Sequence, residues 1–246
     1  MKEYIFSRNA VYEVLRAGRR DVFRILIAEG AQARGHQDEI LAAASARRIP
    51  IERVPRARLD KIHANHQGLA AEVSPFSYSD LLDVFDAAKE RHEPPFFLVV
   101  DSLQDPQNFG TLLRTAEAVG VHGTIIPLAQ SVEVTPAVVN ASAGATEHMR
   151  IVKYNLAQAL DAMKAEDVWV LGLDQHSPEL DDAGQKHLRG GLALVVGSEG
   201  EGMRALVRSK CDVLFRLPMR GRVESLNASV AGSIALYMAH LARRQP

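Results

Sequence analysis

Three short segments of this 246-residue chain combine polar side chains with glycines or other small residues, a composition typical of ligand-binding loops. The first covers residues 101–110 and is followed about one helical turn later by Arg114, the second covers 197–202, and the third runs from 217 to 233. Glycine occupies three of the six positions in 197–202, so the backbone can approach a ligand closely and present its N–H groups. The segment lacks both the phosphate-loop sequence and the glycine spacing of the dinucleotide fingerprint, which argues against those two kinds of nucleotide site.

The first and third segments each lead into a predicted helix. Asn108 is a residue type that caps helix N-termini, and Arg114 projects from a helix that is otherwise apolar. This pattern fits either a ligand site or a capped helix with one surface arginine. Ser225 is a second candidate cap, and small residues follow it at 227–233. They allow another backbone to come close, either within a tightly packed helix or against a cofactor or a second subunit.

The elements that position these segments alternate between strands and helices from residue 96 onward. Apolar runs predict buried strands at 96–100, 123–126, 168–173, 192–196 and 213–217, and helical patterns are found at 111–119, 156–164, 203–209 and 226–242. This order predicts a largely parallel α/β sheet. Ligands of such sheets bind beyond the carboxyl ends of the strands, where the first two segments are expected.

Residues 1–75 predict a smaller α/β unit. Strands are expected at 22–28, 51–54 and 69–73, and a helix at 37–48 that Pro50 stops. Residues 76–95 are the predicted linker; they contain a charged helix, 81–91, that Ser79 or Asp80 caps.

Composition limits the possible functions. The net charge is −1, but residues 1–75 carry 13 Lys+Arg against 9 Asp+Glu, and 204–222 form a second basic run, so both are candidate phosphate-binding surfaces. A single cysteine excludes an internal disulfide framework, and the nine histidines form no persuasive metal set even though His63 and His66 are three apart. No signal peptide or membrane span is recognisable, and a cytoplasmic protein without a metal is expected.

Taken in order, the three segments resemble the signature motifs of the SpoU (TrmH) family of RNA 2′-O-methyltransferases. The family pattern Asp-Pro-x-Asn-x-Gly-x-x-x-Arg-Thr/Ser-Ala is matched by Asp105, Pro106, Asn108, Gly110, Arg114, Thr115 and Ala116. The pattern Gly-x-Glu-Gly-x-Gly is matched by Gly197, Glu199, Gly200 and Gly202. The pattern Ile/Leu-Pro-Met, then Ser-Leu-Asn-x-Ser-x-Ala, is matched by Leu217, Pro218, Met219, Ser225, Leu226, Asn227, Ser229 and Ala231.

The resemblance implies a fold and an assembly that spacing alone does not show. The expected catalytic domain, 96–246, is a parallel-sheet α/β knot of the SPOUT type, in which the C-terminal segment threads a loop as a trefoil and builds the cofactor pocket. A homodimer is implied, with its sites close to the subunit interface. Residues 1–75 resemble the small ribosomal-protein-like RNA-binding domain of the RlmB-like branch. The match is carried by residues 5–14 and by the run 66–71, although Ser7 stands where that branch usually has glycine.

The resemblance also implies roles for individual residues. Main-chain groups of Gly197, Leu217 and Leu226 would hold S-adenosylmethionine, with Met219 and Ser225 nearby. The implied catalytic set is Arg114, Asn108, Glu199, Ser225 and Asn227. Arginine is always protonated and is a poor general base, so Arg114 is expected to hold an RNA phosphate and to stabilise charge on the 2′-oxygen.

The preferred function is methylation of a ribose 2′-hydroxyl in RNA, most specifically of a guanosine in 23S ribosomal RNA. The alternatives are the same reaction on transfer RNA and a non-catalytic RNA-binding protein of ribosome assembly with this fold. A nicotinamide oxidoreductase would need the glycine fingerprint that is missing.

Overall fold

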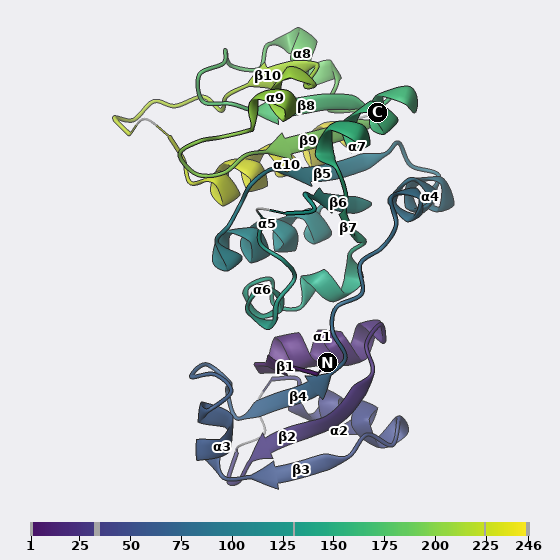
Figure 1. The fold of residues 1–246 in the computed structure, drawn as a ribbon, viewed down its shortest axis with the longest axis vertical. Coiled ribbons are helices and arrows are strands. Elements are labelled where there is room, and N and C mark those ends of the chain that lie inside the picture. The colour runs from purple at the N-terminus through teal and green to yellow at the C-terminus, as the bar shows by residue number, and fades with distance from the viewer. Residues whose placement is uncertain (1, 32–34, 130, 224, 245–246) are drawn as a thin grey trace. The chain divides into compact units, whose positions relative to one another are not determined.

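The computed structural model describes the chain except for residues 1, 32–34, 130, 224 and 245–246, together with the side chains of 182 and 183. The chain forms two compact units (Figure 1). The N-terminal unit contains residues 1–77 and also 133–148, and the C-terminal unit contains 78–132 and 149–246. Each unit is described by itself.

The N-terminal unit is built on a four-stranded mixed sheet of order β1-β4-β2-β3. Its strands are β1 (Glu3–Phe6), β2 (Val22–Ala28), β3 (Ile51–Val54) and β4 (Leu69–Val73). Only β2 and β3 pair in parallel. The helices are α1 (Arg8–Ala17), α2 (Gln37–Ala46), α3 (Arg56–Asp60), α6 (Pro136–Ala141) and the 3₁₀ turn η1 (Ala145–His148).

A buried ion pair ties η1 to the rest of the N-terminal unit. The Arg20 guanidinium donates from Nε and Nη2 to the two carboxylate oxygens of Glu147, at 3.0 and 2.9 Å. Its Nη1 donates to Glu3 and to the Ser74 carbonyl oxygen. A bidentate pair of this kind is specific in its geometry, so residues far apart in sequence are locked together.

The C-terminal unit is built on a six-stranded sheet of order β10-β8-β9-β5-β6-β7 in which all pairings are parallel. Its strands are β5 (Phe96–Val100), β6 (Gly123–Ile126), β7 (Ile151–Lys153), β8 (Trp169–Leu173), β9 (Leu192–Val196) and β10 (Val213–Phe215). Every residue of β5, β6 and β9 is buried, as expected for strands that are covered on both faces.

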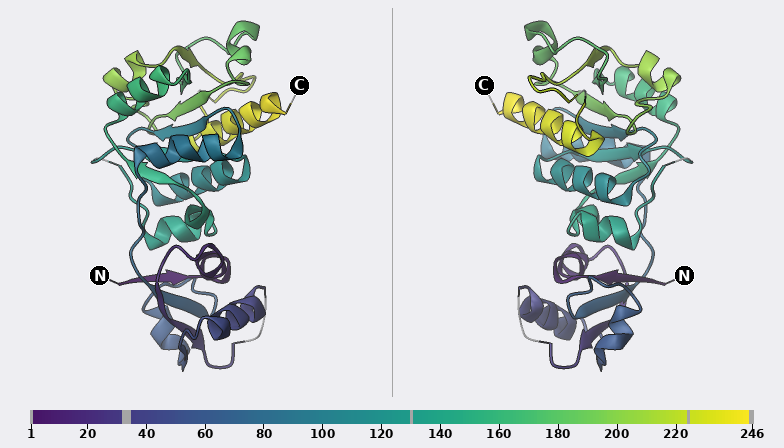
Figure 2. Two further views of the ribbon diagram at one scale, coloured as in Figure 1. Left: turned by 90° about the vertical axis from the view of Figure 1, so that its right-hand side faces the viewer. Right: turned by 90° about the vertical axis from the view of Figure 1, so that its left-hand side faces the viewer.

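Helices cover both faces of this sheet. On one face, α4 (Leu81–Arg91), α7 (Leu156–Ala165) and α9 (Ala205–Ser209) pack on a core that includes Phe97, Val99 and Val195. On the other face, α5 (Pro106–Ala118) and α10 (Ala228–Arg243) lie side by side (Figure 2), and a Cβ at Gly232 would meet Leu112 Cδ1 at 2.8 Å. The small residue at Gly232 therefore allows α10 to pack closely against α5. The short helix α8 (Asp182–Lys186) precedes β9.

The predicted α/β class with a parallel sheet is confirmed. The eight predicted strands differ from their observed counterparts by at most two residues at either end, and the short strands β1 and β7 were not predicted. Two predicted helix starts were wrong. Asp105, not Asn108, is the N-cap of α5, because Asp followed by Pro at the first helical position is the stronger start signal. Asn227, not Ser225, is the N-cap of α10 and accepts from the Ser229 and Val230 N–H groups.

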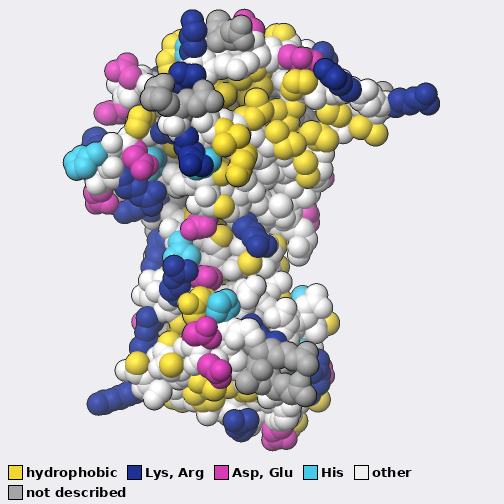
Figure 3. Space-filling model, turned by 180° about the vertical axis from the view of Figure 1, so that it is seen from behind, with side chains coloured by type: hydrophobic (Ala, Val, Ile, Leu, Met, Phe, Trp, Pro, Cys, Tyr) yellow, Lys and Arg dark blue, Asp and Glu magenta, His cyan; other side chains and the backbone are white. Residues whose placement is uncertain are grey.

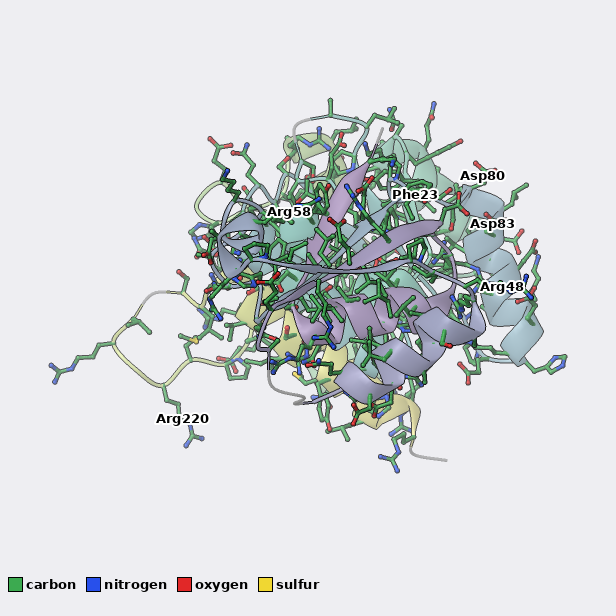
Figure 4. The ribbon with its side chains drawn as sticks, turned by 90° about the horizontal axis from the view of Figure 1, so that it is seen from below. Phe23, Arg48, Arg58, Asp80, Asp83 and Arg220 are labelled. Atoms are coloured by element: carbon green, nitrogen blue, oxygen red, sulfur yellow. The ribbon has the colours of Figure 1, made fainter. Side chains whose placement is uncertain are left out.

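Helix α4 begins after Asp80, as one of the two predicted caps implied, and Asp80 and Asp83 lie together at its start (Figure 4). Among the described residues no helix is both long and apolar enough to cross a bilayer.

Candidate active site

The loop after β9 is a tight glycine turn. Ser198 and Gly202 exchange backbone hydrogen bonds of 3.0 and 3.1 Å, and Gly200 and Gly202 have positive φ. A Cβ at Gly197 would lie 2.3 Å from the Gly202 carbonyl carbon and 2.5 Å from Met203 N. Since those neighbours are backbone atoms, position 197 accepts only glycine without distortion.

A buried carboxylate joins this turn to the loop after β5. The Asp101 side chain is fully buried and accepts from the Arg204 backbone N–H at 2.8 Å and from Arg204 Nε at 2.7 Å. Charge-assisted bonds of this kind fix position as well as contribute energy. The first two segments identified in the sequence are thus fastened to each other at the carboxyl edge of the sheet.

A pocket of about 660 Å³ opens at this edge, beside the glycine turn. It is lined by residues from the ends of β8, β9 and β10 and from the start of α10: Leu173, Asp174, Gln175, His176, Val196, Gly197, Ser198, Glu199, Gly200, Glu201, Gly202, Met203, Arg208, Arg216, Leu217, Met219, Ser225, Leu226, Asn227, Ala228 and Ala231. All five residues predicted to bind a cofactor are in this lining. Its volume lies in the range of pockets that hold cofactors and drug-sized ligands.

A polar cluster at the pocket brings together three of the predicted catalytic residues. Asn108 Nδ2 donates to Glu199 Oε1 at 2.8 Å, and Asn227 Nδ2 donates to the same oxygen and to Asn108 Oδ1. Glu199 and Asn227 are exposed and Asn108 is partly buried. Side chains from α5, the glycine turn and the N-cap of α10 therefore converge on one carboxylate.

Ser229 belongs to this cluster, although it was predicted only as a small helical residue. Its Oγ lies 2.7 Å from Asn227 Oδ1 and 3.2 Å from Asn108 Oδ1, and its side chain is buried. The available signal was that Ser229 occupies a fixed position of the third family motif, two residues after Asn227.

Asp174 and Arg208 form a charged wall of the pocket that sequence reasoning missed. Arg208 donates from Nε at 3.1 Å and from Nη2 at 2.6 Å to Asp174 Oδ2. Burial alone would raise the pKa of Asp174, but hydrogen bonds from Arg208, the His176 N–H and Ser177 Oγ outweigh it and hold this pKa below its usual range. The pocket therefore keeps an anionic side chain at neutral pH. No motif marks these residues, because their proximity depends on the sheet order, in which β8 lies between β9 and β10, the strands on either side of α9 in the chain.

Arg114 lies outside the pocket lining. It is exposed on α5, six residues after Asn108 and next to Thr115, whose Oγ1 lies 2.9 Å from Ser233 Oγ on α10. Within the part of the chain that the structure describes, Arg114 has no hydrogen-bond or ion-pair partner. Its five N–H donors are therefore free for a ligand.

The basic run 204–222 does not form the open phosphate surface that the sequence suggested. Four of its six cations are paired with carboxylates: Arg204 with Asp101, Arg208 with Asp174, Lys210 with Asp161 and Arg216 with Glu179. Arg220 and Arg222 have no partner among the described residues, and Figure 4 shows Arg220 pointing away from the body of the unit. Within this run, Arg220 and Arg222 are therefore the candidates for phosphate contacts.

Comparison with known proteins identifies the family of the chain that carries this site. Residues 95–237 match the family model described as the SpoU rRNA methylase family, and residues 4–79 match the model described as RNA 2′-O ribose methyltransferase substrate binding. The chain belongs to the SpoU rRNA methylase family. It is 42% identical to the Bacillus subtilis protein YacO, named as a TrmH family tRNA/rRNA methyltransferase, over 96% of this chain and 94% of that one. A Staphylococcus aureus protein of the same description is 40% identical over 95% of this chain and 93% of its own length.

Solved structures of SpoU methyltransferases share the fold. The SpoU methyltransferase AviRb of Streptomyces viridochromogenes, solved in complex with the cofactor AdoMet, superposes with a TM-score of 0.80 at 21% identity, over all of this chain and 92% of that one. A crystal structure of an RNA 2′-O ribose methyltransferase superposes with a TM-score of 0.78 at 25% identity, over all of this chain and 90% of that one.

These comparisons confirm the predicted SpoU family, fold class and enzyme class, an RNA (ribose-2′-O)-methyltransferase, and the family's cofactor, S-adenosylmethionine. The roles of the individual site residues, the three domain boundaries, the trefoil threading, the homodimer and the specific RNA stay predictions. The C-terminal unit is called the methyltransferase unit below.

Proposed function

We propose that this SpoU family member uses S-adenosylmethionine to methylate the ribose 2′-hydroxyl of a guanosine in 23S ribosomal RNA, in the cytoplasm. One observation carries the chemical part of the proposal. Gly197, Leu217, Met219, Ser225 and Leu226 line one pocket, and the cluster of Asn108, Glu199 and Asn227 lies at that pocket.

The pocket fits S-adenosylmethionine in size and in chemistry. Leu173, Val196, Leu217 and Leu226 provide apolar surface for an adenine ring, and the segments at 197–202 and 217–219 bring backbone groups to the lining. Gly197 leaves no room for a Cβ, which keeps the two sides of the turn in contact. When bound, the cofactor supplies an electrophilic methyl group on a sulfonium centre.

The residues of the chain then have to place the RNA hydroxyl in line with that methyl group. Glu199 accepts hydrogen bonds from both Asn108 and Asn227, so this carboxylate fixes the position of both amides. We assign this cluster the role of shaping the site and orienting Arg114, whose helix α5 also carries Asn108.

Arg114 is assigned to the RNA rather than to the cofactor. Its guanidinium is exposed and outside the pocket lining. A permanently charged fork suits a phosphate and also suits negative charge on a reacting 2′-oxygen. It does not suit removal of a proton, so we assign Arg114 no role as a base.

The proposed homodimer uses the outer face of α10. Val230, Ile234, Tyr237 and Leu241 are each between 42% and 54% exposed and recur at the spacing of one helical face. Figure 3 shows hydrophobic side chains gathered on this side of the methyltransferase unit. Ala228 and Ala231 at the start of the same helix line the pocket, so a second copy on this face would lie next to the site.

Ribosomal RNA is preferred over transfer RNA as substrate because the chain carries the N-terminal substrate-binding unit. The relatives are named for both kinds of RNA, so transfer RNA is the second candidate.

The test is a transfer assay with methyl-labelled S-adenosylmethionine and unmodified transcripts of 23S ribosomal RNA, 16S ribosomal RNA and transfer RNA. The expected result is label in 23S transcripts that survives alkaline hydrolysis as a dinucleotide, because a methylated 2′-oxygen cannot attack the neighbouring phosphate. Label in transfer RNA alone would overturn the ribosomal assignment, and label on bases alone would overturn the 2′-hydroxyl as acceptor.

A further inference from the structure

A second cavity adjoins the proposed cofactor pocket and is not explained by cofactor binding. It measures about 390 Å³ and lies where β5 and β9 end. Its lining is Ser102, Leu103, Gln104, Asp105, Ser198, Glu199 and Glu201. Ser198, Glu199 and Glu201 also line the larger pocket, so the glycine turn is a wall common to both. Methyl transfer requires the acceptor to lie directly beside the cofactor, and a cavity that shares a wall with the cofactor pocket meets this requirement.

The wall opposite the glycine turn is held in place by the protein itself. Ser102 has a positive φ of 62°, and its Oγ donates to the buried Asp101 carboxylate at 3.1 Å. The Leu103 carbonyl oxygen accepts from the Val132 N–H at 2.9 Å and from Ser131 Oγ at 3.2 Å. These bonds keep 102–105 in one conformation, so this side of the cavity is largely formed before a ligand arrives.

The chemistry of the lining excludes a phosphate as occupant. None of the seven lining residues is Lys, Arg or His, and three of them carry carboxylates. A second negative charge would be repelled there. A neutral, planar group rich in N–H donors suits such a lining, and among the parts of a nucleotide that group is the base.

Two of the three carboxylates already hold groups of the protein. Glu199 accepts from Asn108 and Asn227, and Asp105 caps α5 by accepting from the Asn108 N–H at 2.9 Å. Glu201 is exposed and has no partner among the described residues. It also stands at one of the two variable positions of the glycine motif, so the family pattern does not commit it to the cofactor.

We propose that this cavity takes the base of the acceptor nucleotide and that Glu201 selects guanine there. The proposal rests on the proposed function and names the residue that determines its base specificity. Guanine is the one RNA base whose Watson–Crick edge offers two adjacent donors, N1–H and N2–H, which match the two oxygens of a carboxylate. Adenine, cytosine and uracil each set an acceptor beside their donor, and that acceptor would face the second carboxylate oxygen. Enzymes that act on single nucleotides read an extruded base in this way.

The experiment compares the wild-type enzyme with Glu201→Gln, which keeps the shape of the side chain and removes its charge. The matched control is Glu166→Gln, an exposed glutamate at the end of α7, outside both cavities. Synthetic RNA of the mapped target carries guanosine, inosine or adenosine at the acceptor position. Inosine lacks only the N2 amino group. Transfer rate and S-adenosylhomocysteine affinity are both measured.

The wild type and Glu166→Gln should methylate guanosine about 10-fold or more faster than inosine, the size of effect expected from one hydrogen bond to a charged group. Glu201→Gln should methylate guanosine about 10-fold more slowly than wild type and no longer distinguish inosine. Because Glu201 also lines the cofactor pocket, the rates are compared at saturating S-adenosylmethionine, and the loss of discrimination should persist there. An unchanged preference for guanosine in Glu201→Gln would overturn the role of Glu201. A wild-type target other than guanosine would overturn guanine recognition while leaving 2′-O-methylation intact, whereas no transfer to any RNA would count against the proposed function itself.

Discussion

Two polar clusters in this molecule are built from similar side chains and are used differently. In the N-terminal unit, the side chains of Arg20 and Glu147 are each 1% exposed and bind each other through two hydrogen bonds. In the methyltransferase unit, Asn108, Glu199 and Asn227 meet where solvent reaches them. The first cluster satisfies its groups within the protein, and the second leaves oxygens and N–H groups available. Solvent access and unused hydrogen-bonding capacity therefore separate a structural cluster from a candidate site better than residue type does.

The largest expected effect on stability comes from breaking the buried pair. Glu147→Ala leaves the Arg20 guanidinium buried without its main partner, which should lower the free energy of unfolding of the N-terminal unit by about 3–5 kcal/mol. Urea unfolding measures this change. Glu52→Ala is the control, because Glu52 is 40% exposed in its pairs with Arg24 and Arg58 and should cost about 1 kcal/mol or less. Equal losses in the two variants would show that burial does not distinguish the clusters.

The largest expected effect on activity comes from the other region. Arg114→Ala should reduce kcat/KM for RNA by about 10²–10³-fold, the range found when one group that stabilises a developing oxyanion is removed. Affinity for S-adenosylhomocysteine should stay within about twofold of wild type, because Arg114 lies outside the pocket lining. Steady-state transfer and calorimetry measure the two quantities. A variant that loses cofactor affinity along with activity would contradict the assignment of Arg114 to the RNA.

The comparison also shows what the sequence could and could not predict. Most strands were predictable because continuous apolar runs such as 96–100 and 192–196 mark strands covered on both faces. Strands β1 and β7, of four and three residues, were not predicted, because so short a run gives no clear pattern. Glu199, Asn108 and Asn227 were predictable as a set from their motifs. The starts of α5 and α10 were not predicted, because Asn108 and Ser225 resemble caps and a stronger cap lies nearby in each case, Asp105 and Asn227.

Other features depend on long-range pairing that no local pattern encodes. Arg208 on α9 reaches Asp174 at the end of β8, and the interaction joins residues 34 positions apart. It depends on the sheet order, in which β8 lies between β9 and β10. Residues 133–148 pack with the N-terminal unit through partners such as Arg20, 127 positions from Glu147. The same pairing of charges explains why a basic run in the sequence became mostly neutralised in the structure.

A smaller effect is expected from pH, at a buried polar group of the methyltransferase unit. His122 Nδ1 accepts from the Phe96 N–H at 3.0 Å, and Nε2 lies 3.0 Å from Glu93. Burial is the main cause that lowers the pKa of His122, and the positive charges of Arg91 and Arg243 lower it further against the opposing effect of Glu93. The unfolded chain therefore binds the proton more readily than the folded one.

The stability that comes from keeping His122 neutral should be fully present above the pKa of about 6.5 that histidine has in the unfolded chain. It should fall as the pH drops below that value. The thermal midpoint of the methyltransferase unit should decrease between pH 7.5 and 5.5, and it should decrease less in His122→Gln, which has no group to titrate there. A steeper decrease in the variant would contradict the sign of the shift.

The smallest expected effect concerns the two unpaired arginines of the 217–226 segment. Replacing Arg220 and Arg222 by alanine should weaken RNA binding and lower the slope of log affinity against log salt by about 0.7 for each phosphate that the protein no longer neutralises. Filter binding between 50 and 300 mM salt measures the slope. Arg216→Ala is the matched control, since Arg216 already pairs with Glu179. An unchanged slope in the double variant would place the phosphate-binding residues elsewhere.

The most direct test of the account is whether the cofactor enters the pocket beside the glycine turn. Calorimetric titration of S-adenosylhomocysteine should show binding to the wild type and to Gly190→Ala, where a Cβ would meet nothing within 4 Å. Gly197→Ala places its Cβ 2.3 Å from the Gly202 backbone and should lose detectable binding while circular dichroism shows a folded chain. Wild-type affinity in a folded Gly197→Ala protein would contradict the central claim that the three motif segments form one methyl-transfer site.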